Sequence, residues 1–149
     1  MYIPQPEASK FFVNEDEMSV NAPAIHQRII ALLTMGLGNL YHGTKSISLE
    51  PLPEMMLDFT YRSPTPDLIL FDNVTQQTRI IIEICQTTSL KSDLRKIIRL
   101  VDEDIYGIQE GFVFNYKTHQ WYRYRLGDGG LTTESSFSDI LQLDLNTFL

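Results

Sequence analysis

Two stretches of sequence decide the fold: Pro66-Asp67-Leu68-Ile69-Leu70-Phe71 and Arg79-Ile80-Ile81-Ile82-Glu83-Ile84-Cys85. Both contain short apolar runs that lack the alternation of apolar and polar residues expected of a strand with one face in water. Strands of this kind are buried on both faces and usually lie in the middle of a sheet. We therefore predict two neighbouring central strands, with a turn that begins at Asp72-Asn73 between them.

Apolar residues at helical spacing mark one segment on each side of these strands. The first predicted helix runs from Ala24 to about Tyr41, with Pro23 in its first turn. The second is predicted between residues 89 and 106, where Ser89 can cap the helix and Gly107 fits its end. The apolar stripes expected to be buried are Ile25, Ile29, Leu32, Leu33, Gly36, Leu37 and Leu40 in the first helix and Leu90, Leu94, Ile97, Ile98, Val101 and Ile105 in the second.

Further extended segments are expected around residues 47–49 and 55–61, and Pro51 and Pro53 between them favour a bent or edge strand. Later in the chain, extended segments are predicted at residues 112–115, 121–125 and 140–145, the last as a strand or a packed tail. The order of elements is typical of an α/β domain in which two main helices flank a mixed central sheet. Because the second helix is a crossover, the strands on either side of it should be parallel.

The composition limits the class of protein. The chain has 149 residues, 43% hydrophobic and 21% charged, which is ordinary for one globular domain and excludes a fibrous or largely disordered chain. Twelve basic and nineteen acidic residues give a net charge of −7, which excludes the broadly basic surface of non-specific duplex binders. Cys85 is the only cysteine, so neither an intrachain disulfide nor a cysteine-based zinc cage can form.

We divide the chain into an N-terminal arm, residues 1–22, and a single domain, residues 23–149. The arm lacks the continuous apolar run of a signal peptide, and no stretch approaches the ~20 apolar residues of a membrane span. Together with the lone cysteine, these features predict a cytoplasmic protein with no membrane partner.

Two acidic residues stand where acids are unfavourable. Asp67 opens the first central strand, and Glu83 lies among isoleucines in the second. A buried carboxylate is costly unless it is paired or binds a cation, and two carboxylates that converge from neighbouring strands repel each other. A Mg²⁺ or Mn²⁺ ion removes that penalty, activates a water and stabilises negative charge on a phosphate. The alternative reading makes Asp67 a turn acid and pairs Glu83 with Arg79 or with a lysine of the second helix.

The order of these residues resembles a known superfamily. Pro66-Asp67 before an apolar strand, a hairpin and then Glu83-Ile84 are similar to the core motif of the PD-(D/E)XK, or restriction-endonuclease-like, nucleases. The detailed pattern resembles the bacterial Uma-type endonuclease family over most of residues 22–149. The features similar to that family are Ala24-Ile25-His26 with Ile29, Asp93 with Lys96, Gly107-Ile108-Gln109-Glu110 before Phe112-Val113-Phe114, and Phe137-Ser138-Asp139-Ile140-Leu141.

The resemblance implies a restriction-endonuclease-like fold and a metal-dependent DNA endonuclease, which hydrolyses phosphodiester bonds with a water bound to Mg²⁺ or Mn²⁺. It implies that Asp67 and Glu83 hold the metal ion with the backbone carbonyl of Ile84 alongside, and that His26 helps the site. The alternative for His26 is a structural one, in which a histidine near the start of a helix serves for capping or packing. Three acids that precede Asp67 are open candidates for a third metal ligand: Glu50, Glu54 and Asp58.

The superfamily's lysine should stand at position 85, where this chain has Cys85. A neutral, buried thiol cannot supply the positive charge that stabilises the attacked phosphate. The resemblance points to Lys96 as the replacement catalytic lysine. Helix geometry favours Lys91 instead, because at ~100° per residue Lys96 points away from the apolar stripe and Lys91 flanks it.

A DNA-cutting enzyme also needs positive charge along the path of its phosphates. Lys91, Arg95 and Arg99 recur every four residues on one flank of the second helix. Arg123 and Arg125 alternate with aromatic residues that can stack on bases, although this arrangement is also ordinary on a solvated sheet face. The arginines among these residues are our candidates for binding nucleic acid.

Cys85 and the acidic net charge leave two other hypotheses open. One is a nuclease fold that has lost catalysis and serves as a binding or regulatory module. The other is a small self-associating protein without a ligand. A homodimer is expected in each case, because superfamily members often dimerise to cut two strands and the hairpin over residues 112–125 offers an edge.

Overall fold

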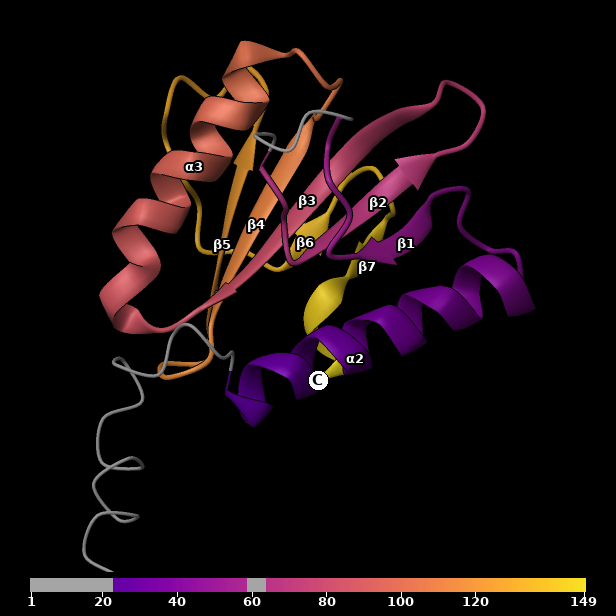
Figure 1. Ribbon diagram of the computed structural model, residues 1–149, viewed down its shortest axis with the longest axis horizontal. Helices are drawn as coiled ribbons and strands as arrows, with labels where there is room; N and C mark the ends of the chain where they lie inside the picture. The colour runs from indigo at the N-terminus through magenta and orange to yellow at the C-terminus, as the bar shows by residue number, and fades with distance from the viewer. Residues whose placement is uncertain (1–22, 59–63) are drawn as a thin grey trace, which may run out of the picture.

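The fold has three layers, in the order helix, sheet, helix (Figure 1). A computed structural model describes residues 23–58 and 64–149. A five-stranded sheet with the order β1-β2-β3-β4-β5 forms the middle layer, with α2 against one face and α3 against the other. The elements are α2 (Ala24–Gly38), η2 (Asn39–Gly43), β1 (Glu50–Pro53), β2 (Leu68–Asp72), β3 (Gln77–Cys85), η3 (Thr87–Ser89), α3 (Leu90–Glu103), β4 (Glu110–Asn115), β5 (Gln120–Arg125), β6 (Phe137–Ser138), β7 (Leu143–Asp144) and η4 (Leu145–Phe148).

The strand directions confirm the predicted mixed sheet. β2 pairs antiparallel with β1 and with β3, β4 pairs parallel with β3, and β5 returns antiparallel to β4. α3 connects the parallel pair β3 and β4, which is the predicted crossover. β3 lies at the centre of the sheet with β2 beside it, so both apolar runs are interior strands as predicted.

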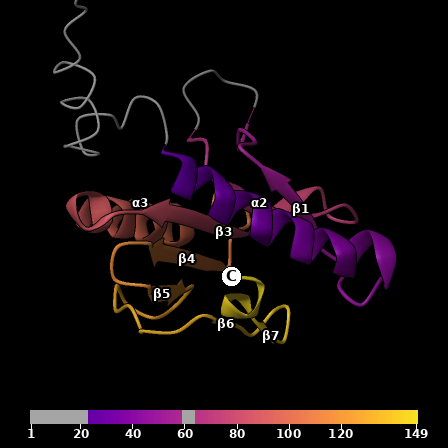
Figure 2. The same ribbon diagram turned by 90° about the horizontal axis from the view of Figure 1, so that it is seen from below.

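Each face of the sheet has its own hydrophobic core, because successive residues of a strand point to opposite faces. Leu68 and Leu70 of β2 join the core on the α2 side, and Ile69 between them joins the core on the α3 side. The C-terminal end of the chain, which includes the β6–β7 ribbon and η4, also packs on the α2 side (Figure 1 and Figure 2). The segment predicted as a strand or a packed tail contains a short strand, β7, followed by a 3₁₀-helix whose first residue, Leu145, is buried.

The buried face of α2 differs from the predicted stripe. The helix begins at Ala24, so Pro23 precedes its first turn. Ile25 and Leu32, both predicted to be buried, are exposed because the helix presents a face rotated toward Ile30 to the sheet. The buried residues of α2 are Ile29, Ile30, Leu33 and Leu37.

α3 is shorter than predicted. It ends at Glu103 because Asp104 adopts the left-handed conformation, with a φ of 52°. Ile105, predicted as the last member of the buried stripe, lies beyond that end and is exposed, and Leu100 is buried in the helix. Ser89 precedes the helix but makes no side-chain capping bond to it.

Extended structure before β2 is also shorter than predicted. β1 covers only Glu50–Pro53, and residues 47–49 and 55–58 form no strand. Residues 59–61 of that predicted segment lie outside the described residues, as does the predicted arm, residues 1–22. The edge position is confirmed, since β1 is the first strand of the sheet and its two prolines lack an N–H group to donate. Glu54 then takes a left-handed φ of 52°, which ends the strand.

None of the helices in the described part of the chain is long and apolar enough to cross a membrane. That finding agrees with the absence of a long apolar run in the sequence.

The C-terminal end packs on α2 where the helix carries no side chain. Leu145 of η4 is fully buried, and the Phe148 ring lies against Gly36, so a Cβ added at Gly36 would overlap the ring. Gly38, half a turn further along α2, has open space around it. These two glycines therefore make a matched pair for testing the contact.

We expect Gly38→Ala to raise the free energy of unfolding by about 0.5–1 kcal/mol, because alanine favours a helix over glycine. Gly36→Ala gains the same helical preference but should lower the free energy of unfolding, since the new methyl group displaces Phe148. Urea unfolding followed by circular dichroism measures both changes. Equal stabilisation by the two substitutions would contradict the packing of η4 on α2.

Candidate functional site

Asp67 and Glu83 meet on one face of the sheet. The antiparallel register pairs Leu68 with Ile82, so the next residues outward, Asp67 and Glu83, stand opposite each other with their side chains on the same face. The two carboxyl groups are close enough for the charge of Asp67 to raise the pKa of Glu83. The convergence of these two acids, which the sequence predicted, is present in the structure.

Asp67 is held in its ionised form by two donors on one oxygen. The backbone N–H of Ile84 donates to Oδ2 at 2.7 Å, and Nε2 of His26 lies 3.3 Å from the same atom. Burial of Asp67 opposes ionisation, but these hydrogen bonds outweigh it and hold the pKa of the Asp67 carboxyl below its ordinary value. The bond to Asp67 also raises the pKa of His26.

Glu83 is in the opposite state. Its side chain is only 6% exposed, and burial, followed by the charge of Asp67, raises its pKa to about 8. Lys96 works against that shift, with Nζ 2.7 Å from Oε1 of Glu83. The pair of acids therefore shares one proton near neutral pH, as two crowded carboxyl groups do when no cation separates them.

The structure brings one of the two candidate lysines to the acids. Lys96 reaches across from α3 to Glu83, whereas Lys91 is exposed at the start of the helix. The helical-wheel argument placed Lys96 away from the sheet, and that expectation is wrong. The long aliphatic stem of a lysine can lie along the helix surface and carry its ammonium group to a point that its Cα does not face.

The alternative pairing of Glu83 with Arg79 does not occur. Arg79 donates to the backbone carbonyl of Gly107 at 3.1 Å and lies 3.8 Å from Asp72, at the far end of β3. Glu83 does pair with a lysine of α3. Such a pair is expected both if the acids only stabilise the fold and if they form a catalytic site, so it does not distinguish the two hypotheses.

A cavity of about 330 Å³ opens beside Asp67. Its walls come from the start of α2, the end of β1 and the segment between β3 and α3. The lining residues are Pro23, His26, Gln27, Glu54, Asp67, Ile84, Cys85, Gln86, Ser89 and Tyr116. The sequence analysis missed Gln86, Ser89 and Tyr116 as lining residues, although their positions directly after buried strands or before a helix place them at the edge of the sheet where the acids lie.

The backbone carbonyl of Ile84 faces the same region. Along β3 the backbone groups point alternately to the two neighbouring strands, and the carbonyl of Cys85 accepts the N–H of Tyr116 on the β4 side. The N–H and C=O of Ile84 therefore face the β2 side, where the N–H binds Asp67. Pro66, directly before Asp67, has no N–H to offer that carbonyl.

Of the three candidates for a third acidic metal ligand, only one lines the cavity. Glu50 accepts a hydrogen bond from Asn73 and Asp58 accepts one from Tyr106, both away from the cavity, whereas Glu54 lines the cavity. No group of three or more His, Cys, Asp or Glu side chains within residues 23–58 and 64–149 is arranged to hold a metal ion. A metal ion at this site would therefore rest on two carboxylates and a backbone carbonyl.

Two further residues shape the electrostatics of the site. Burial raises the pKa of the Cys85 thiol to about 12, so this residue stays neutral and does not replace the charge of a lysine. Burial also raises the pKa of Asp93, in the first turn of α3, although the charge of Lys96 pulls it down. Asp93 thus adds a third acid near Glu83 and Cys85.

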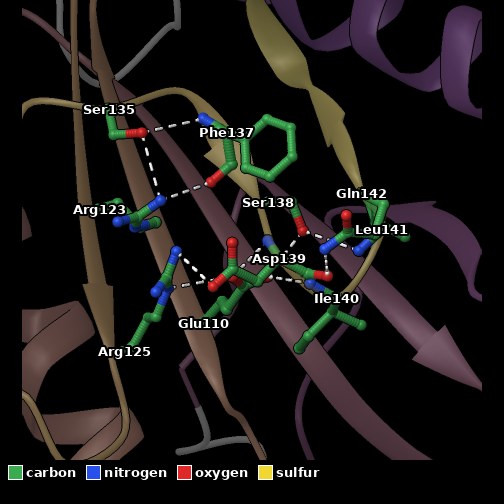
Figure 3. A network of polar contacts seen from close by, with 10 residues as sticks. All are labelled: Glu110, Arg123, Arg125, Ser135, Phe137, Ser138, Asp139, Ile140, Leu141 and Gln142. Carbon is green, nitrogen blue, oxygen red and sulfur yellow. Dashed lines mark hydrogen bonds and ion pairs between the residues drawn. The ribbon is translucent and has the colours of Figure 1, made fainter.

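Arg123 and Arg125 are engaged within the protein (Figure 3). Arg123 donates to the backbone carbonyl of Phe137 at 2.9 Å, and Arg125 pairs with Glu110 and, at 2.6 Å, with Asp139. Glu110 is buried and also accepts the hydroxyl of Ser138 and the N–H of Asp139. These contacts hold the C-terminal segment around residues 137–139 against β4 and β5. By contrast, the two other arginines predicted to bind nucleic acid, Arg95 and Arg99, are exposed on α3.

Comparison with known proteins identifies a shared fold. The sequence matches no protein-family model and no curated protein. A crystal structure from Anabaena variabilis ATCC 29413, described as a "putative nuclease belonging to DUF820", is similar, with a TM-score of 0.59. The two chains are 12% identical, and the match covers 85% of this chain and 81% of that one. At this identity the likeness confirms the predicted α/β fold, a mixed sheet between two main helices.

We expect the metal-free protein to lose stability as the pH rises from about 5 to 8. The pKa of Glu83 is about 8 in the folded protein and has an ordinary value of 4.5, so folding favours its protonated form. That contribution is complete below the ordinary value and is lost as the pH rises through the folded-state value. Glu83→Gln, which is always neutral, should flatten the fall.

Melting temperatures measured in EDTA across this pH range provide the test. The raised pKa of His26 gives a fall of the same sign, which the variant retains, so the difference between the two proteins isolates Glu83. The same slope in both proteins would show that Glu83 is not the group that titrates.

Proposed function

We propose that this protein is a divalent-metal-dependent phosphodiesterase that cuts DNA. The observation that carries the proposal is the Asp67–Glu83 pair, with Lys96 bound to Glu83 at 2.7 Å. Two acids held together away from water favour a cation between them, and a lysine beside them offers the fixed positive charge that phosphate chemistry requires. The fold shared with a structure described as a "putative nuclease" supports the same function.

The residues present fit a hard cation such as Mg²⁺ or Mn²⁺. Asp67, Glu83 and the carbonyl of Ile84 would hold it, and all three offer oxygen ligands. Magnesium sites commonly use one or two carboxylates and leave the other positions to water and substrate phosphate, so the lack of a third acidic ligand is compatible with such a site. When bound, the ion would neutralise charge that develops on the phosphate and make an attacking water more acidic.

The side chains divide the remaining work. Glu83 can release its proton when a cation takes the proton's place, because burial and the nearby Asp67 are what raise its pKa. Lys96, beside Glu83, would supply positive charge for a phosphate bound at the site, which is the task of the lysine missing at position 85. Asp67 stays ionised throughout, since two hydrogen bonds hold it in that form.

The exposed flank of α3 offers a path for the DNA backbone. Ser89, directly before α3, lines the cavity, and Arg95 and Arg99 stand exposed further along the helix. Contacts of arginine with phosphates position a duplex without reading its sequence. This local path offsets the net charge of −7 in the region where the substrate would lie.

A binding or regulatory module is the second candidate function. Cys85 in place of the superfamily's lysine and the acidic net charge favour it. In that case the cavity would bind a metal ion or a phosphate group without cleaving it. A homodimer remains our proposal for either function.

The protein should nick supercoiled plasmid DNA in Mg²⁺ or Mn²⁺ and should not do so in EDTA. Asp67→Asn and Glu83→Gln keep the size of each side chain and should lower the nicking rate by about 100-fold or more, the scale of losing one electrostatic group. Calorimetry should show saturable Mn²⁺ binding that Asp67→Asn abolishes. Binding of Mn²⁺ without cleavage of DNA or RNA at any pH would overturn the catalytic proposal and favour the binding module.

Lys96→Met should lower the nicking rate at saturating DNA by about 100-fold, because it removes the positive charge beside the phosphate. Its matched control is Lys91→Met on the same helix, which should affect only the affinity for DNA. Both variants should bind Mn²⁺ as the wild-type protein does. A rate loss in Lys91→Met but not in Lys96→Met would assign the catalytic role to Lys91.

A further inference from the structure

His26 is the side chain through which α2 touches the pair of acids. It lies in the first turn of the helix, with Nε2 3.3 Å from Oδ2 of Asp67. Its side chain is only 16% exposed and forms part of the cavity wall. Lys96 reaches the other acid from α3, so each acid receives a partner from a different helix layer.

The contact falls on an oxygen that already has a donor. The N–H of Ile84 donates to Oδ2 of Asp67 at 2.7 Å, and His26 approaches the same atom. Two donors on Oδ2 fix the rotation of the carboxylate about its Cβ–Cγ bond. Oδ1 is then the oxygen of Asp67 that is left for a cation.

A purely structural role for His26 is poorly supported. The helix begins without a side-chain cap, so His26 does not satisfy the backbone groups of its first turn. Nδ1 of the ring is buried and makes no hydrogen bond to any described residue. The docking of α2 on the sheet comes instead from apolar residues such as Ile29 and Leu33.

We propose that His26 is a positioning residue that holds Asp67 with Oδ1 directed at a divalent cation shared with Glu83. The inference rests on the proposed metal-dependent function and adds to it a residue that does not itself touch the ion. A hydrogen bond to the outer oxygen of a ligating carboxylate orients that ligand and strengthens binding of the metal. His26 also fixes which oxygen of Asp67 serves as the ligand.

The test is calorimetric titration of Mn²⁺ into the full-length protein, without DNA. His26→Leu should weaken Mn²⁺ binding by about 10–100-fold, the range measured when such partners of metal ligands are removed. His26→Gln can place an amide N–H near the position of Nε2 and should restore most of the affinity. The plasmid-nicking assay at saturating Mn²⁺ should show His26→Leu recovering most of its rate, since excess metal compensates for a misplaced ligand.

Ile29→Val is the control for α2 docking. It lies one turn after His26 in the apolar contact with the sheet, so it should lower the melting temperature without changing Mn²⁺ affinity. Equal Mn²⁺ affinity in the wild type and in His26→Leu would overturn the role of His26 while leaving the metal site standing. Failure of the wild type to bind Mn²⁺ would instead overturn the proposed function, so the two failures are distinguishable.

Discussion

Two carboxyl groups that face each other from adjacent strands, largely shielded from water, determine how the rest of the site is built. Repulsion between Asp67 and Glu83 is strong in this environment, so they cannot both be ionised without help. The metal-free protein solves this with a proton on Glu83 and with donors on Asp67. A divalent cation offers the same relief and, unlike a proton, can also act on a substrate.

The layered fold assigns a separate task to each layer. The sheet brings the acids together, because Glu83 lies in β3 and Asp67 directly precedes β2, which pairs with β3. α2 delivers His26 from one side and α3 delivers Lys96 from the other. The geometry of the site therefore depends on how both helices dock, which is why apolar contacts far from the acids matter to its chemistry.

The sequence predicted the structure correctly where the neighbouring residues in the chain were enough to indicate the position of a residue in the fold. Isoleucines on both sides of Glu83 predicted a central strand that contains an acid. A helix of crossover length predicted that β3 and β4 are parallel. The family resemblance pointed to Lys96, but helix geometry did not predict that it reaches Glu83, because a helical wheel gives the direction of a Cα and not the path of a long side chain. Arg125 appeared available for DNA, since its partners Glu110 and Asp139 come from segments whose meeting no local pattern reveals.

The packing of Phe148 on Gly36 joins two parts of the chain that are far apart in sequence, and this affects how the protein folds. The segment that covers Gly36 is synthesised long after α2, so this part of the α2 surface is uncovered until η4 has been made. Contacts between such distant parts of a chain form slowly, because a large loop must close before they are gained. Until then, the apolar surface of α2 that η4 covers is exposed, and exposed apolar surface of this kind favours aggregation of a nascent chain.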